Sequence, residues 1–221
     1  MVMLKYFELQ ADSLQREWAR NFLLRSDSVA GLYERCFDGR IVTDSARKLI
    51  VLLRSAKTSD HLKELGVVLT AEIVRDYAAF FELPERQMQS FSLECLHSGC
   101  LEAASHFGWA ADCFENARSA VLQANFVNQW VHRHKAIQRT MGWRAELHCT
   151  HDLVEFRADL VVFNGREELC RIAALRTEPD RMIFSWELGK LRWSSETCVE
   201  LQGVRGIRSK YWELEAYLSA L

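Results

Sequence analysis

Several side chains of the types that bind zinc lie close together in the first half of the sequence. They are Cys95, His97, Cys100, His106 and Cys113. Thiolate and imidazole groups are common zinc ligands, but the segment has no C-x2-C pair. Ser98-Gly99 is also expected to end a helix between Cys95 and Cys100. We therefore interpret the cysteines as buried thiols and His97 as a surface residue, and we expect no metal and no cofactor.

A second reactive group is the run His148-Cys149-Thr150-His151-Asp152. A thiol between imidazoles can be activated as a thiolate nucleophile. On a β-strand, however, adjacent residues point to opposite faces, so His148 and Cys149 would meet only if the chain turned there. We interpret the run as a strand end with exposed histidines and an inward-facing cysteine, and we assign no catalytic residue.

A third group lies in a stretch without any acidic residue, from Asn116 to Ala145. Its basic and aromatic residues are candidates for a partner-binding or anion-binding surface. They are Trp130, Arg133, Lys135, Arg139, Trp143 and Arg144, with His132 and His134 among them. Cations near the end of a helix can simply complement its dipole. The same residues could also bind an acidic protein, or phosphates and stacked bases.

The signatures of common enzyme classes are missing from the sequence. There is no glycine-rich dinucleotide-binding or P-loop motif, no H-E-x-x-H, no G-x-S-x-G and no EF-hand loop. This lowers the expectation of a cofactor-dependent enzyme, and we expect a protein that is not an enzyme.

The apolar residues change their period once, at Met141-Gly142. Helical spacing precedes this point, and alternation in twos follows it from Trp143 to about Trp193. The fold class predicted is α+β, with an N-terminal helical bundle, a small antiparallel β-meander of three to four strands, and an amphipathic C-terminal helix over 207–221. We expect a helical region over 1–141 and a sheet region over 142–221, packed as one globular unit.

Within the first region the pattern predicts a series of helices. They cover about 13–25, 28–37, 43–53, 70–82, 84–98, 100–107 and 109–140. The longest carries mostly small residues at heptad spacing, namely Cys113, Ala117, Ala120, Ala124, Val127 and Val131. This seam favours close packing of a neighbouring helix, and a homodimeric coiled coil through 113–131 is the alternative.

In the second region Asn164-Gly165 is a strong hairpin signal. A three-residue loop, 164–166, would place Leu160 opposite Cys170 and pair Asp159 with Arg171, so we prefer it to a shorter loop. Further strands are expected over 182–188 and 191–193.

The composition restricts the class of protein. The formal net charge is -2, which argues against a nucleic-acid binder driven by total charge. The seven cysteines are odd in number and irregularly spaced, which favours reduced thiols in an intracellular protein. We expect no secretory signal and no membrane span, and therefore a cytoplasmic protein.

From these observations we expect a non-enzymatic, intracellular protein–protein interaction module, such as an adaptor, inhibitor or assembly factor. It would bind a protein with an acidic surface through the basic helix end at the helix-to-sheet junction. The alternative is a nucleic-acid- or phosphate-binding protein that uses the same patch. An uncommon enzyme with a Cys/His site is a third interpretation.

Overall fold

The computed structural model of the protein describes residues 1–12, 15–56, 58, 61–206 and 208–218. These residues form two compact units, Met1–Asn128 and Gln129–Leu221, each with its own hydrophobic core. No helix in the described ranges is long and apolar enough to cross a membrane. The expectation that the two regions pack as one globular unit stays a prediction.

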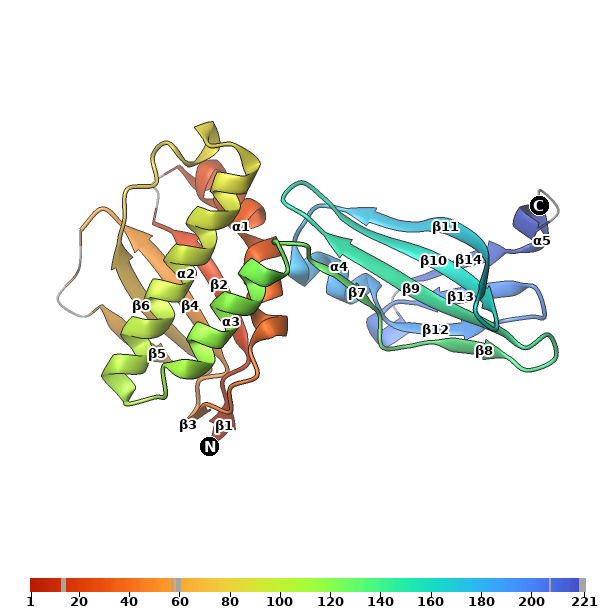
Figure 1. Cartoon of the computed structure of the whole chain (residues 1–221), viewed down its shortest axis with the longest axis horizontal. Helices are drawn as coiled ribbons and strands as arrows, with labels where there is room; N and C mark the ends of the chain where they lie inside the picture. The colour runs from red at the N-terminus through yellow and green to blue at the C-terminus, as the bar shows by residue number, and fades with distance from the viewer. Residues whose placement is uncertain (13–14, 57, 59–60, 207, 219–221) are drawn as a thin grey trace. The chain divides into compact units, whose positions relative to one another are not determined.

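The N-terminal unit is built on a four-stranded sheet rather than a helical bundle (Figure 1). Its elements are β1 (Val2–Met3), β2 (Tyr6–Ala11), α1 (Arg16–Cys36), β3 (Val42–Thr43), β4 (Lys48–Arg54), β5 (Leu62–Leu65), β6 (Val68–Val74), the 3-10 helix η1 (Phe80–Glu82), α2 (Glu85–Phe107) and α3 (Asp112–Gln123). The sheet has the order β2-β4-β6-β5. Strands β2, β4 and β6 are parallel, and β5 is antiparallel to β6.

The apolar run in β4 explains why the bundle prediction is wrong. Leu49, Val51 and Leu53 are all 0% exposed, and the residues between them are half-buried. The buried side chains of β4 join those of α1, α2 and α3 in one core, so the helices cover one face of the sheet. A short apolar run of this kind is typical of a buried parallel strand as well as of a buried helix. Of the predicted helix over 43–53, residues 48–53 lie in strand β4; of the predicted helix over 70–82, residues 70–74 lie in strand β6 and 80–82 form the 3-10 helix η1.

Helix α2 continues through Gly99, where the sequence predicted a helix end. A Cβ atom at Gly99 would lie 2.4 Å from Cγ2 of Val51, which is far closer than two carbon atoms can approach. Glycine is therefore present because α2 packs tightly on β4, not because the helix stops.

Helix α3 is much shorter than the predicted helix over 109–140. It ends at Gln123, and Asn125 and Phe126 follow with φ angles of 52° and 60°. Two left-handed residues in succession cannot continue an α-helix. The chain then forms β7 (Gln129–Val131) and β8 (Ala136–Gln138), so the predicted seam of small residues is not one continuous helical line.

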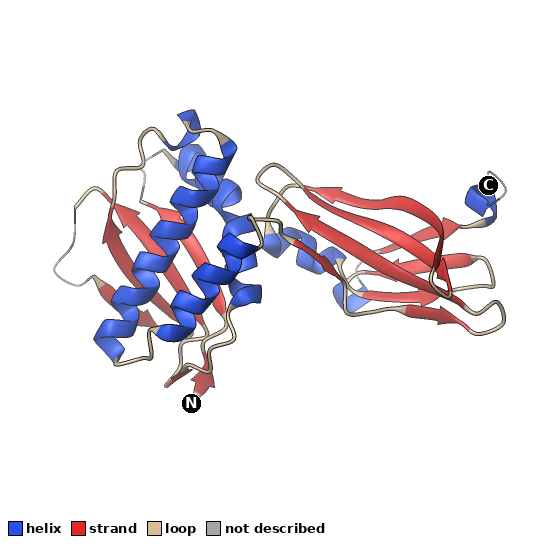
Figure 2. Cartoon of the chain, viewed as in Figure 1, coloured by secondary structure: helices blue, strands red, loops and turns tan. Residues whose placement is uncertain are grey.

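The C-terminal unit contains two antiparallel sheets, not one small meander (Figure 2). The elements after β8 are β9 (Trp143–His151), β10 (Phe156–Asn164), β11 (Glu167–Thr177), α4 (Arg181–Glu187), β12 (Lys190–Trp193), β13 (Cys198–Gln202), the 3-10 helix η2 (Val204–Gly206), β14 (Ser209–Glu213) and α5 (Glu215–Leu218). One sheet has the order β11-β10-β9-β7, with β8 also paired to β9. The other has the order β12-β13-β14.

Two predicted elements of this unit are wrong in type. Residues 181–187 form α4 instead of a strand, because the Asp180 side chain accepts a hydrogen bond of 2.8 Å from the Met182 amide and caps the helix. Within the predicted final helix over 207–221, residues 209–213 form strand β14, in which half-buried and exposed residues alternate, while residues 207 and 219–221 lie outside the described part of the chain. Only the short helix α5 follows it.

The β10–β11 hairpin also differs from its predicted register. Asn164 pairs with Glu167, so the loop consists of Gly165 and Arg166 alone. Gly165 has the expected left-handed φ of 58°. The shorter loop and a bulge in β11 opposite Val162 and Phe163 place Leu160 opposite Ile172 rather than Cys170, and a second bulge shifts the register again beyond Asp159.

Candidate functional site

The two tryptophans of the predicted binding surface lie against the core of the C-terminal unit. The Trp130 ring centroid is 5.9 Å from that of Phe156, and the Trp143 centroid is 6.2 Å from that of Trp193. Both rings are half-buried, because Trp130 pairs with the inward-facing Cys149 in the β-ladder and Trp143 begins β9. They contribute packing there rather than an open stacking platform.

Two of the predicted cations share one carboxylate. Lys135 Nζ and Arg144 Nε each lie 2.8 Å from Oε1 of Glu146, and His148 Nε2 lies 3.3 Å from its Oε2. Burial would raise the pKa of Glu146, but hydrogen bonds from Lys135 and His148 and the charges of Lys135 and Arg144 outweigh it and lower the pKa. The charges of Lys135 and Arg144 are thus partly balanced inside the molecule.

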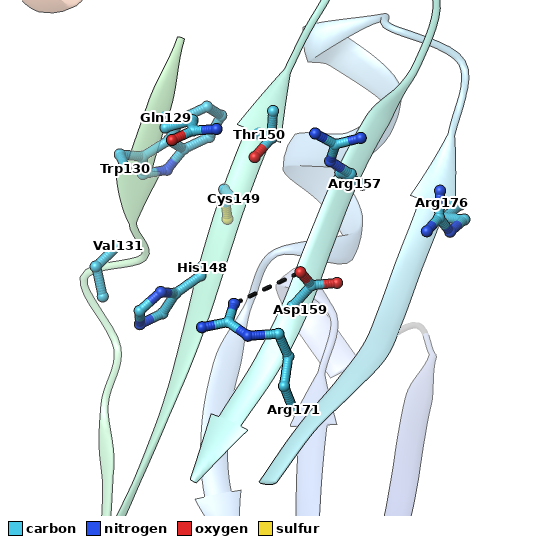
Figure 3. Close-up of a pocket in the computed structure, with 10 residues that line it drawn as sticks. All are labelled: Gln129, Trp130, Val131, His148, Cys149, Thr150, Arg157, Asp159, Arg171 and Arg176. Carbon is cyan, nitrogen blue, oxygen red and sulfur yellow. Dashed lines mark ion pairs between the residues drawn. The ribbon is translucent and has the colours of Figure 1, made fainter. Parts of the chain in front are cut away.

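A hollow of about 640 Å³ lies on the outer face of the five-stranded sheet. We call it the arginine hollow, and its lining includes His148, Thr150, Arg157, Asp159, Arg171 and Arg176 (Figure 3). The strand alternation that turns Cys149 inward presents these side chains outward.

Every arginine of this hollow has a carboxylate partner. Arg171 binds Glu168 at 2.8 Å and Asp159 at 3.6 Å. Arg157 and Arg176 share Glu155, at 3.5 Å and 3.0 Å. The ion pair between Asp159 and Arg171 was predicted from sequence, although Arg171 stands directly opposite Val161 in the ladder. The positive charge of this hollow is therefore largely compensated.

A second hollow, of about 400 Å³, combines the predicted Arg133 with residues from two later segments of the C-terminal unit. We call it the basic hollow. Its lining residues are Arg133, His134, Leu188, Gly189, Lys190, Gln202, Gly203, Val204, Arg205 and Gly206. The three cations are exposed, and no acidic residue is in this lining.

The cations of the basic hollow differ from those of the arginine hollow in their partners. Arg133, Lys190 and Arg205 make no ion pair with any residue that the structure describes. The carboxylate of Glu187, which directly precedes the lining residues 188–190, has other partners: it lies 3.7 Å from Arg208 and 3.5 Å from Lys210. Glu200 of the adjacent strand accepts from Arg192 at 2.6 Å and from Ser209 at 2.8 Å. The basic hollow therefore carries unbalanced positive charge.

Local backbone geometry holds the basic hollow in shape. A Cβ atom at Gly189 would lie 2.0 Å from the Gln202 carbonyl oxygen, so only glycine allows the start of β12 to approach the end of β13. Arg205 has a φ of 59°, which is costly for a residue with a side chain. Its guanidinium lies over the Trp186 ring, 5.6 Å from the centroid, within the range of a cation–π contact.

Sequence reasoning found one cation of this hollow and missed two. Arg133 was a candidate, and Lys190 and Arg205 were not, because both lie far along the chain from Arg133, Lys190 directly after Gly189 and Arg205 between Gly203 and Gly206. The local signal was present as Gly189-Lys190 and Arg205-Gly206. The last candidate, Arg139, is exposed in the turn between β8 and β9 and lies outside both hollows.

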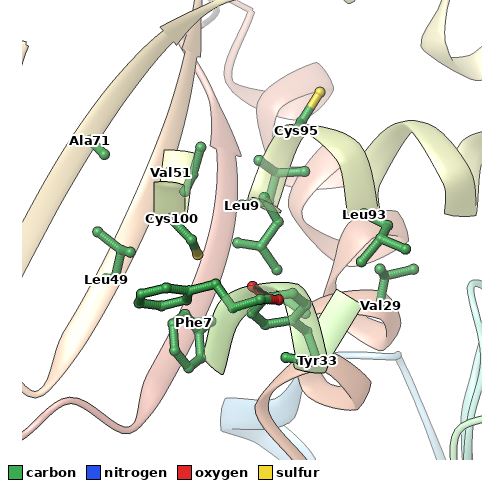
Figure 4. Packing of buried hydrophobic residues seen from close by; sticks show 14 of the residues in the cluster. Phe7, Leu9, Val29, Tyr33, Leu49, Val51, Ala71, Leu93, Cys95 and Cys100 are labelled. Carbon is green, nitrogen blue, oxygen red and sulfur yellow. Dashed lines mark hydrogen bonds between the residues drawn. The ribbon is translucent and has the colours of Figure 1, made fainter. Parts of the chain in front are cut away.

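Cys95 and Cys100 are buried in the N-terminal core (Figure 4), and Cys113 is half-buried against it. Burial raises the pKa of Cys95 to about 11 and that of Cys100 still further. His97 is 6% exposed rather than on the surface, with Nε2 3.3 Å from Glu115 and Nδ1 3.4 Å from the Tyr33 hydroxyl. No set of three metal-ligating side chains converges within the described part of the chain.

The run around Cys149 follows the alternation of β9. Cys149 is 1% exposed and belongs to the core, while His148 faces outward toward Glu146. His151, expected to be exposed, is 1% exposed, and its Nε2 lies 3.0 Å from the Pro179 carbonyl oxygen. The inward position of Cys149 agrees with the prediction, and the strand separates it from His148.

Comparison with known proteins gives no relative from which a role could be transferred. No protein-family model, no curated protein and no solved structure matches this chain.

Proposed function

We propose that this protein is a non-enzymatic protein–protein interaction module that binds an acidic surface of a partner through the basic hollow. The observation that carries the proposal is that Arg133, Lys190 and Arg205 surround one hollow without a carboxylate partner among the described residues. Exposed cations without a partner gain more from an acidic ligand than cations that must first give up an ion pair. A cytoplasmic location is part of the proposal, supported by the odd number and irregular spacing of the seven cysteines.

A protein partner is favoured over nucleic acid by the position of the tryptophans. Sequence-tolerant binding of single strands combines basic residues with aromatic rings on which bases stack. Trp130 and Trp143 instead pack on the core, and the ring beside the basic hollow, Trp186, is already in contact with the Arg205 guanidinium. Arginine and tryptophan are also enriched at the centres of protein interfaces, and Arg205 and the half-exposed Trp186 occur together here.

Charge reversal tests the proposal directly. The full chain and a variant with Arg133, Lys190 and Arg205 changed to Glu would be immobilised and exposed to extract of the source cell, with and without nuclease treatment. The matched control carries the same change at Arg16, Arg40 and Arg166, which are exposed and lie outside both hollows. Bound proteins would be quantified by mass spectrometry at rising salt.

We expect a partner that binds to the wild type and to the control but not to the hollow variant. Rising salt should release this partner, because salt screens interactions between exposed charges. Retention of every wild-type partner by the hollow variant would contradict the proposal. Loss of all partners on nuclease treatment, together with tight binding of a 20-nucleotide RNA, would assign the surface to nucleic acid instead.

A further inference from the structure

The charge of the basic hollow exceeds what one carboxylate can balance. Arg133, Lys190 and Arg205 bring three positive charges to the same hollow, whereas an Asp or Glu side chain brings one negative charge. A phosphorylated side chain carries about −1.5 to −2 at neutral pH and three acceptor oxygens. Arginine can bind such a group with two parallel hydrogen bonds, and lysine binds it as a point charge. Of the two ligand chemistries, phosphate is the closer match in charge.

The glycine amides of the hollow are already hydrogen-bonded within the chain. The Gly189 amide donates to the Glu187 carbonyl at 3.0 Å, the Gly203 amide to Arg208 at 2.7 Å, and the Gly206 amide to Gly203 at 3.0 Å. These three amides are already used. The guanidinium and ammonium groups are the charged donors that the hollow presents to an anion, and single substitutions can remove them.

An apolar rim beside the hollow favours a phosphate carried by a protein over a free phosphate ion. Helix α4 is joined to the hollow by the contact of Trp186 with Arg205. Met182, Ile183 and Trp186 of α4 are 71%, 43% and 45% exposed, and their spacing places them on neighbouring positions of the helix surface. Residues that flank a phosphorylated side chain could pack on this rim, whereas an inorganic ion would make no use of it.

We propose that the basic hollow binds the phosphate group of a phosphoserine or phosphothreonine in the partner protein. Arg133, Lys190 and Arg205 contact the phosphate, and the flanking residues of the partner pack on Met182, Ile183 and Trp186. This inference rests on the proposed function and names the group that is recognised. Arginine clusters are a recurring way to recognise phosphorylated segments.

Peptide binding to the full chain tests the inference without knowledge of the partner. The probes are three fluorescent peptide libraries with degenerate flanking positions and a central phosphoserine, serine or glutamate. Fluorescence polarisation would be measured for the wild type, Arg205→Asn, Lys190→Ala and the control Arg166→Asn. Asparagine suits position 205 because it tolerates the left-handed backbone, and thermal unfolding would verify that each variant is folded.

We expect the phosphoserine library to bind at least about tenfold more tightly than the glutamate library. Arg205→Asn and Lys190→Ala should each weaken that binding about tenfold, as the loss of one charge-assisted hydrogen bond implies. Arg166→Asn should leave it unchanged. Met182→Ser should weaken the binding of the phosphoserine peptides but should leave the affinity for inorganic phosphate unchanged.

Other outcomes would overturn the inference in distinguishable ways. Equal binding of the phosphoserine and glutamate libraries, lost in both hollow variants, would remove the phosphate requirement and leave the proposed acidic partner standing. Inorganic phosphate binding as tightly as the peptides would indicate a free-ion site. Equal binding of all three libraries, unaffected by Arg205→Asn and Lys190→Ala, would reject both the inference and the proposed function.

Discussion

Arg205 combines backbone strain with an exposed charge. A left-handed conformation costs a residue with a side chain about 1–2 kcal/mol, and here it aims the guanidinium across Trp186. Strain of this kind is often kept where it serves a site.

The conformation of Arg205 gives a stability prediction. Arg205→Val should unfold with a free energy about 1–2 kcal/mol lower than Arg205→Asn, because valine disfavours the left-handed region and asparagine tolerates it. Urea denaturation of the two variants measures the difference. Equal stability would contradict the positive φ of this residue.

Glu146 balances two cations that the sequence singled out, Lys135 and Arg144. Glu146→Gln should lower the free energy of unfolding by about 1–2 kcal/mol at neutral pH, since the charge-assisted hydrogen bonds are lost and their donors are partly exposed.

The same variant has a predicted pH profile. The lowered pKa of Glu146 stabilises the folded state above the unfolded value near about 4.3, and this stabilisation disappears as the pH falls through the folded pKa. The wild type should therefore lose stability more steeply than Glu146→Gln on acidification below about pH 5. Parallel pH profiles in thermal melts would show that Glu146 is not the titrating group.

Single residues of the site were predictable only where they share a segment. Arg133, Lys135, Arg139 and Arg144 stood out because they lie in one acid-free stretch. Lys135 approaches Glu146 through the pairing of β8 with β9, which no local pattern reveals, whereas Arg144 and Glu146 are two residues apart on β9 and share a face. Lys190 and Arg205 join Arg133 only through the fold.

At the scale of elements, buried segments were the hardest to assign. The run 49–53 is apolar on both faces, so its period cannot separate a strand from a helix. The strands β9 and β10 have one clear polar face, and their existence was predicted. The predicted hairpin register is wrong because the loop has two residues instead of three and because two bulges in β11 interrupt the regular pairing.

The contact between α2 and β4 gives a prediction at this scale. Gly99→Ala should destabilise the protein by about 1–3 kcal/mol, because the new methyl group overlaps Val51 and overpacking outweighs the better helix propensity of alanine.

A double-mutant cycle would show whether the loss of stability in Gly99→Ala arises from its contact with Val51. Val51→Ala removes the clashing methyl groups, so the double variant should be more stable than the sum of the two single changes implies. Additive effects would mean that Gly99 matters for another reason. Chemical denaturation of the four proteins provides the measurement.

At the scale of the whole molecule, the boundary between the two compact units does not coincide with the change in apolar period. The period changes at Met141-Gly142, whereas the compact units meet between Asn128 and Gln129. The short strands β7 and β8 account for the difference. They belong to the sheet of the C-terminal unit through pairing with β9, and they are too short for their alternation to be recognised in the sequence.

The separate cores predict that the C-terminal unit folds by itself. Residues 129–221 contain one complete hydrophobic cluster and every residue of the basic hollow. A fragment of these residues should therefore unfold cooperatively, show the circular dichroism of a strand-rich protein, and bind the phosphoserine library as tightly as the full chain.

A shorter fragment, 142–221, is the matched control. It lacks β7, β8 and Arg133, and it should neither unfold cooperatively nor bind the library. If 129–221 remains unfolded while the full chain melts in a single transition, the two units depend on each other for stability, and the binding surface would have to be studied in the intact protein.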